Sequence, residues 1–150
     1  MLNRIPPISS QLGVDAMKFN IMLVDESISV LESLQRLLKD EPYYLFAFDN
    51  PLDALKVINT LEWDIVVADQ SMQKMDGLEF LERVRSHSPH TVGIIMTGDD
   101  ETKVKLELLY SGNDYRFVKK PLDDIEIKHA LKAAIADYKR NSGVISHEIV

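Results

Sequence analysis

Short apolar runs alternate with longer amphipathic segments along most of this chain. The runs are rich in β-branched, aliphatic and aromatic residues, as buried strands are, and they cover residues 20–24, 43–48, 64–68, 92–96 and 117–119. Most of the intervening segments repeat apolar residues at intervals of three and four, which is helical spacing. Strands that alternate with helices predict an α/β domain built on a parallel sheet.

Start and stop signals predict five helices in these segments. Ser27 and Asn50 are expected N-caps, and Pro51 stands at a first helical position. The expected helices start near residues 28, 51, 78, 101 and 123, and the last two end near Tyr110 and Tyr138. The apolar residues with helical spacing are Val30, Leu31, Leu34, Leu37 and Leu38, on one face; Leu52, Leu55, Ile58 and Leu61; Leu78, Leu81 and Val84, expected to face inward; and Ile127, Leu131, Ala134 and Ile135, expected to be buried.

The chain is expected to form a single domain with short extensions. Its 150 residues, 45% of them hydrophobic, are enough for one sizeable core. Residues 1–17 contain Pro6-Pro7 and Gly13 and show neither the helical nor the strand periodicity of apolar residues. They are therefore predicted to be an N-terminal arm. Residues 18–140 are predicted to be the doubly wound α/β domain, and residues 141–150 a C-terminal tail.

Composition excludes several classes of protein. A net charge of −7 argues against direct binding of nucleic acid or of an anionic membrane. Without cysteine there is no disulfide framework and no thiolate zinc site. The first residues lack the pattern of a secretion signal, and no apolar stretch approaches the roughly 20 residues of a membrane span. A cytoplasmic protein is therefore expected.

Residues that can handle a phosphoryl group follow four of the predicted strands: Asp25-Glu26, Asp69, Thr97 and Lys120. The carboxyl ends of parallel strands meet at one edge of a sheet, so these side chains are expected to converge. Three carboxylates repel one another, which favours a hard divalent cation such as Mg²⁺ between them. An aspartate among them can act as a nucleophile, while a lysine and a hydroxyl neutralise phosphoryl oxygens. Aspartyl-phosphate chemistry is the resulting hypothesis.

Four segments together resemble the receiver domain of two-component response regulators: residues 21–26, 69–77, 96–98 and 117–121. The resemblance covers residues 18–140 and implies a flavodoxin-like (βα)5 fold with a parallel five-stranded sheet of order 2-1-3-4-5. Asp69-Gln70 and residues 114–117 resemble one branch in particular. Receivers of that branch are often fused to HD-type cyclic-di-GMP phosphodiesterase or transcriptional output domains.

The resemblance also implies roles for individual residues. Asp69 would be the phosphoacceptor, Lys120 would contact the phosphoryl group, and Thr97 with Phe117 would form a switch pair. The implied Mg²⁺ ligands are Asp25, Glu26, Asp69 and the backbone carbonyl of Ser71. The phosphoryl donor would be a sensor histidine kinase or a histidine phosphotransfer protein of a bacterial phosphorelay. Such a domain promotes only its own phosphorylation and dephosphorylation, so no separate enzyme activity is expected. A homodimer through the fourth helix, fifth strand and fifth helix is a further expectation.

The sequence departs from the family pattern at two positions. Glu26 stands where an aspartate is usual, and Gln73 stands where a proline is usual. The longer carboxylate is expected to shift or weaken metal binding, and the loss of proline to loosen the loop after Asp69. These departures support an alternative, a pseudo-receiver that binds proteins without phosphorylation. Two other classes fit less well. A haloacid-dehalogenase-like phosphatase needs an aspartate where Ser71 stands, and a flavin carrier needs a hydroxyl-rich loop after the first strand.

Overall fold

The computed structural model describes residues 18–98 and 115–143. In chain order its elements are β1 (Phe19–Val24), α2 (Ile28–Leu38), β2 (Tyr43–Phe48), α3 (Pro51–Lys56), β3 (Ile65–Asp69), α4 (Gly77–His87), β4 (Val92–Thr97), β5 (Arg116–Lys119) and α6 (Asp124–Ser142). The expected N-terminal arm, the helix expected near residues 101–110 and the tail from residue 144 lie outside the described residues.

The five strands form one parallel sheet in the order β2-β1-β3-β4-β5, which confirms the predicted fold class. The chain moves outward from β1 to β2 on one side and then crosses back to β3 on the other. The order therefore reverses between β1 and β3, and a crevice forms beyond the carboxyl ends of strands at such a point. Asp25 follows β1 there, and Asp69 is the last residue of β3.

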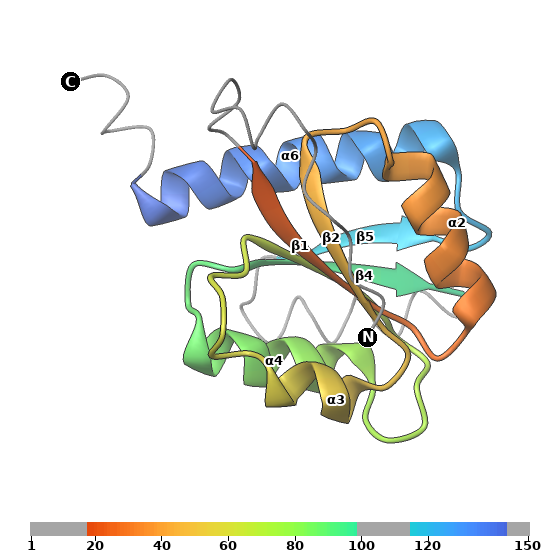
Figure 1. Ribbon diagram of the computed structural model, residues 1–150, viewed down its shortest axis with the longest axis horizontal. Coiled ribbons are helices and arrows are strands. Elements are labelled where there is room, and N and C mark those ends of the chain that lie inside the picture. The colour runs from red at the N-terminus through yellow and green to blue at the C-terminus, as the bar shows by residue number, and fades with distance from the viewer. Residues whose placement is uncertain (1–17, 99–114, 144–150) are drawn as a thin grey trace.

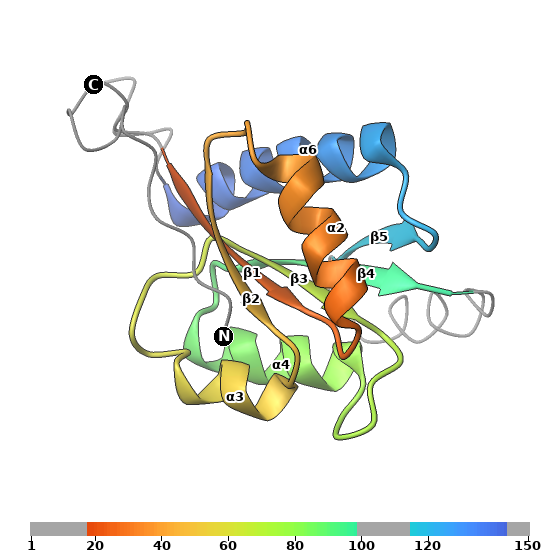
Figure 2. The same ribbon diagram turned by 45° about the vertical axis from the view of Figure 1, so that its right-hand side comes forward.

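Helices cover both faces of the sheet (Figure 1). One core cluster joins β1 residues Ile21 and Leu23 to α2 and α6, and the other joins Met22 and Val24 to α3 and α4. This division follows from strand geometry, because successive side chains point to opposite faces. The turned view shows α2 and α6 on one side of the strands and α3 and α4 on the other (Figure 2). The central strands are buried on both faces, which explains their continuous apolar runs.

Side chains cap the starts of the helices as the sequence predicts. The Ser27 hydroxyl accepts a hydrogen bond from the Val30 amide at 3.4 Å, and the Asn50 side chain accepts one from the Leu52 amide at 2.9 Å. Asp76 and Asp123 cap α4 and α6 in the same way. These caps place the start of each helix immediately after the strand end or loop that carries the polar residues.

Helix α3 ends earlier than the apolar spacing predicts. It stops at Lys56, because the following amides of Val57, Ile58 and Thr60 each bond to the carbonyl three residues back. The Thr60 hydroxyl also donates to the Val57 carbonyl at 2.7 Å. Leu52 and Leu61, which share the helical spacing, are exposed, whereas Ile58 and Ala54 are buried.

Helix α6 continues past Tyr138, its expected end, to Ser142, and Gly143 closes it in the left-handed conformation at φ 78°. Its buried residues are Ile127, Leu131 and Ala134, while Ile135 is only partly buried, contrary to expectation. Over residues 18–98 and 115–143, no helix combines the length and the hydrophobicity needed to cross a membrane.

Candidate functional site

The Lys120 ammonium joins the two aspartates at the carboxyl edge of the sheet. Its Nζ lies 2.6 Å from Asp25 Oδ2 and 3.1 Å from Asp69 Oδ1. Asp25 is 1% exposed and Asp69 is 7% exposed, so both carboxylates are largely removed from water. The three groups come from the ends of β1, β3 and β5, as the strand-end argument predicts.

Backbone hydrogen bonds fix the chain on either side of this cluster. The Asp25 amide donates to the Phe48 carbonyl at 3.1 Å, and the Lys120 amide donates to the Thr97 carbonyl at 2.7 Å. The second oxygen of the Asp25 carboxylate, Oδ1, accepts a hydrogen bond from the Ser27 amide at 2.8 Å. Asp25 therefore has one oxygen directed to the start of α2 and one directed to Lys120. The bond from the Ser27 amide has a local signal, because an aspartate that accepts from the amide two residues on forms a common turn.

Hydrogen bonds of Gln70 hold the loop after Asp69 against β4 and the start of helix α4. Its backbone amide donates to the Met96 carbonyl at 2.9 Å, and its carbonyl accepts from the Gly77 amide at 3.1 Å. Its side-chain oxygen accepts from the Leu78 amide at 3.1 Å. The loop from residue 70 to 76 is thus closed at its base. No local pattern predicts this role of Gln70, because a glutamine next to an acidic residue has no fixed partner.

Gly77 allows this closure. A Cβ atom at position 77 would lie 2.6 Å from the backbone oxygen of Asp69, closer than such atoms approach. We expect Gly77→Ala to destabilise the protein by roughly 1–3 kcal/mol, since backbone cannot yield as a flexible side chain does. Gly98→Ala is the matched control, because nothing lies within 4 Å of a Cβ there. Urea unfolding of both variants tests this, and equal midpoints would contradict the close approach.

The charges at this edge shift two ionisation equilibria. Burial raises the pKa of the Asp69 carboxyl, and the Asp25 charge raises it further, against the opposing effects of Lys120 and the Ser71 amide. Burial lowers the pKa of the Lys120 amine, but the hydrogen bond and charge of Asp25, together with Asp69, outweigh it, so the pKa lies above its ordinary value. Lys120 therefore stays protonated, and Asp69 is a more basic carboxylate than one in water.

Thr97 and Phe117 lie on neighbouring strands. The register pairs Ile95 of β4 with Phe117 of β5, and Thr97 with Lys119. Thr97 therefore lies two residues beyond Ile95, the residue directly opposite Phe117. Strand alternation places both side chains on the α3 and α4 face. Thr97 is 2% exposed, and its hydroxyl is 3.5 Å from the Val118 carbonyl, while Phe117 is only partly buried. The two side chains therefore lie on the same face of neighbouring strands, one buried and one partly buried.

The donor atoms around Asp69 fit a hard divalent cation. Two buried carboxylates share a single ammonium group, which leaves negative charge uncompensated. Carboxylate and carbonyl oxygens are the ligands that Mg²⁺ prefers. Ser71 lies in the exposed loop two residues beyond Asp69, and a hydrogen bond from its backbone amide lowers the pKa of the Asp69 carboxyl, against the effect of burial.

Glu26 lies apart from the other two acidic residues. Its Oε2 accepts a hydrogen bond from the Gln73 amide at 3.0 Å. Across residues 18–98 and 115–143, no three acidic, histidine or cysteine side chains are grouped so that they could hold a metal ion. The structure thus brings Asp25, Asp69 and Lys120 together, and Glu26 is directed to the loop instead.

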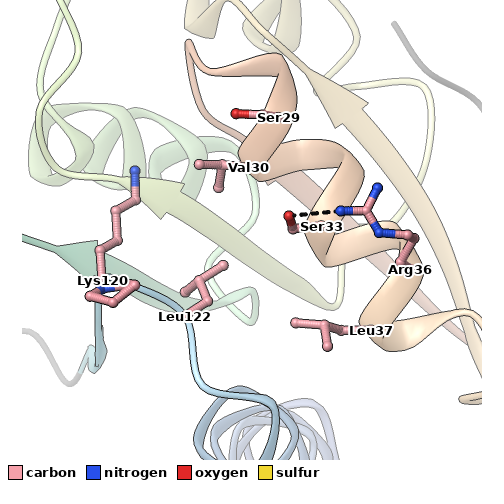
Figure 3. Close-up of a pocket in the computed structure, with 8 residues that line it drawn as sticks. Ser29, Val30, Ser33, Arg36, Leu37, Lys120 and Leu122 are labelled. Atoms are coloured by element: carbon pink, nitrogen blue, oxygen red, sulfur yellow. Dashed lines mark hydrogen bonds between the residues drawn. The ribbon is translucent and has the colours of Figure 1, made fainter.

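A groove of about 440 Å³ opens beside the cluster, between α2 and the segment that follows β5. Its apolar walls come from Val30, Leu37 and Leu122, and Lys120 lines it as well (Figure 3). Arg36 adds a second cationic group and donates a hydrogen bond to Ser33 at 3.2 Å. Lys120 is therefore shared between the groove and the acidic cluster.

Residues 21–132 match the family model of the response regulator receiver domain. The chain is 34% identical over 118 residues to the transcriptional regulatory protein ZraR of Klebsiella oxytoca, an alignment that covers 78% of this chain and 26% of that protein. It is 31% identical over 129 residues to the regulatory protein VanR of Enterococcus faecium, covering 85% of this chain and 54% of that protein. The chain thus spans only a quarter to a half of the length of these two curated relatives.

A solved structure is also similar. The signal receiver domain of an HD domain-containing protein from Pseudomonas fluorescens Pf-5 has a TM-score of 0.76 and 32% identity, and the match covers 83% of this chain and 99% of that one.

Proposed function

Because the chain belongs to the response regulator receiver domain family, we propose that it is a switch in bacterial two-component signalling, in which Asp69 accepts a phosphoryl group. One observation carries this proposal: a protonated Lys120 lies 3.1 Å from the Asp69 carboxylate, at the crevice where the strand order reverses. A buried nucleophile with a fixed cation beside it is arranged to receive an anionic group.

The phosphoryl transfer uses groups that this chain supplies. An oxygen of the Asp69 carboxylate forms a bond to phosphorus as the bond from phosphorus to the donor histidine nitrogen breaks, and the nitrogen retains the electron pair. The Lys120 ammonium neutralises one phosphoryl oxygen as charge builds there. The Thr97 hydroxyl donates a hydrogen bond to another. Asp25 holds Lys120 in position through the 2.6 Å contact.

Asp25, Glu26, Asp69 and the Ser71 carbonyl would hold Mg²⁺, which when bound supplies positive charge for the transferred group. The hard oxygen donors and the shared ammonium described above support this assignment. Glu26 would have to turn from its present hydrogen bond to take part.

The output is proposed to run through Thr97 and Phe117. A phosphorylated Asp69 offers Thr97 a stronger hydrogen-bond acceptor than the bare carboxylate. Movement of the Thr97 side chain would leave space on its face of the sheet, and the partly buried Phe117 would fill it. This would alter the face formed by β5 and α6. We still predict that a homodimer forms through this face. The helix expected near residues 101–110, which would complete that face, lies outside the described residues.

The proposed donor is a sensor histidine kinase or histidine phosphotransfer protein that docks in the groove beside Lys120. The groove supports this occupant, because its apolar walls end at the cation that contacts Asp69. The similar proteins named above include a transcriptional regulatory protein and an HD domain-containing protein. Outputs of these kinds, and a cytoplasmic location, are proposed for the present chain on that likeness.

A pseudo-receiver, which would bind partners without phosphorylation, is the second candidate. The displacement of Glu26 from the acidic cluster favours it. Against it stand Asp69 and Lys120, which keep the contact that phosphoryl transfer needs.

We expect acetyl phosphate with Mg²⁺ to add one labile phosphoryl group to the protein, detected by intact-mass spectrometry. Acetyl phosphate replaces the histidine donor, so no partner is required. Prior chelation of the metal should reduce the adduct at least about tenfold, because the negative charge at the site then repels the incoming anion. A protein that stays unmodified across a wide range of Mg²⁺ concentrations would favour the pseudo-receiver.

A further inference from the structure

We propose that Glu26 and the Gln73 amide form a latch that competes with Mg²⁺, so that the ion binds only when the Glu26 carboxylate leaves the loop. This inference rests on the proposed metal site and adds a regulatory contact to it. The latch is defined as the hydrogen bond from the Gln73 backbone amide to Glu26 Oε2, 3.0 Å long, between residues 47 positions apart in the chain.

The latch depends on the identity of both residues. Gln73 has a backbone N–H to donate, which proline would lack. Glu26 has one more methylene than aspartate, and its reach extends from the end of β1 to the loop beyond β3. The two departures from the family pattern that the sequence shows are thus the donor and the acceptor of a single contact.

The latch also changes the charge at the acidic cluster. With Glu26 directed to the loop, Asp25 and Asp69 share Lys120 and no third carboxylate joins them within the described residues. A third carboxylate beside this pair would be repelled unless a cation arrived with it. The Gln73 amide gives Glu26 a favourable position while no such cation is present.

Both latch residues are exposed, so the hydrogen bond is weak enough to exchange. Its opening would free Glu26 to act as a ligand and would release the loop that carries Ser71. The base of that loop stays closed, because Gln70 holds it to α4 by bonds that do not involve Glu26. The latch therefore sets the Mg²⁺ concentration at which the site fills, without being needed for the fold.

Isothermal titration calorimetry with Mg²⁺ alone tests the latch in wild type and four variants. Gln73→Pro removes the donor. Gln73→Ala is its matched control, since alanine keeps the backbone N–H. Glu26→Asp shortens the acceptor, and the double variant Glu26→Asp with Gln73→Pro completes a mutant cycle.

We expect Gln73→Pro to bind Mg²⁺ about three- to tenfold more tightly than wild type, the range that one exposed hydrogen bond contributes. Gln73→Ala should bind as wild type does. In the Glu26→Asp background, Gln73→Pro should change the affinity by less than about twofold. Unchanged or weaker binding by Gln73→Pro overturns the latch, as does equal tightening in both backgrounds, which would show that proline acts on the loop itself.

Amide hydrogen exchange in wild type gives a second measurement that needs no substitution. Mg²⁺ should speed exchange at the Gln73 amide while the Leu78 amide, bonded to Gln70, stays protected. Slower exchange at Gln73 with Mg²⁺ would mean that the contact persists and would overturn the proposal. If wild type shows no heat with Mg²⁺ and no change in exchange, the proposed metal site fails, which is a different outcome from a site that binds Mg²⁺ without a latch.

Discussion

Asp69→Asn is expected to abolish the phosphoryl adduct formed from acetyl phosphate and to raise the thermal stability of the protein. The loss follows because the amide oxygen of asparagine is a poor nucleophile and no stable acyl phosphate can form on it. Asparagine has nearly the shape of aspartate, so the packing around position 69 is kept. The two effects have different causes and can be measured on one sample.

The gain in stability follows from the charge of Asp69. Burial, and then Asp25, raise the pKa of Asp69 in the folded protein above its value in the unfolded chain. The ionised carboxylate therefore weakens the fold at neutral pH, and protonation removes this penalty. The difference in melting temperature between variant and wild type should be fully present above the raised pKa. It should vanish as the pH falls below about 3.9, the ordinary aspartate value.

Mass spectrometry at neutral pH and thermal unfolding between about pH 3 and pH 8 check both expectations. Ser71→Ala is a control that changes a nearby exposed side chain but keeps the backbone carbonyl and the nucleophile. An adduct that persists on Asp69→Asn would place the phosphoacceptor elsewhere. A variant less stable than wild type at neutral pH would show that the pair with Lys120 outweighs burial and Asp25.

Lys120→Met is expected to lower the stability of the protein, whereas Asp69→Asn raises it, and to slow phosphorylation. Methionine keeps most of the side-chain stem but leaves Asp25 and Asp69 without the ammonium they share. Breaking a buried ion pair costs about 3–5 kcal/mol, and the 25% exposure of the Lys120 side chain reduces this to roughly 1–3 kcal/mol. Removing one preorganised charge from the transition state should slow adduct formation by about 10²-fold.

Lys119→Met is the matched control for this variant. Lys119 is the preceding residue, is exposed, and carries the same charge. Denaturant unfolding and the rate of adduct formation should distinguish the two variants clearly. Similar behaviour of both would mean that net charge, and not the contact with Asp69, governs the site.

The sheet and the convergence of the site could be predicted because their signals are local. A strand buried on both faces needs an unbroken apolar run, and the runs at residues 20–24 and 92–96 lie within the strands that form. The strand-end rule then brings Asp25, Asp69 and Lys120 to one edge without any knowledge of their partners. The strand order and the register of the parallel sheet then set which of these side chains are neighbours.

Other features depended on contacts that no local pattern records. The apolar spacing to Leu61 predicted a longer α3, but the hydrogen bonds near Thr60 tighten the chain and end the helix at Lys56. Glu26 was expected to lie with the other acidic residues, since its neighbour Asp25 does. Its actual partner is the Gln73 amide, 47 residues away in the chain. The possible hydrogen bonds of an exposed side chain differ little in free energy, so the sequence does not indicate which one forms.

Lys120 lines the groove beside α2 and also contacts Asp69, so the proposed donor site and the proposed phosphoacceptor share one cationic side chain. Because the ammonium already contacts Asp25 and Asp69, any change in its partners at Asp69 would also alter one wall of the groove.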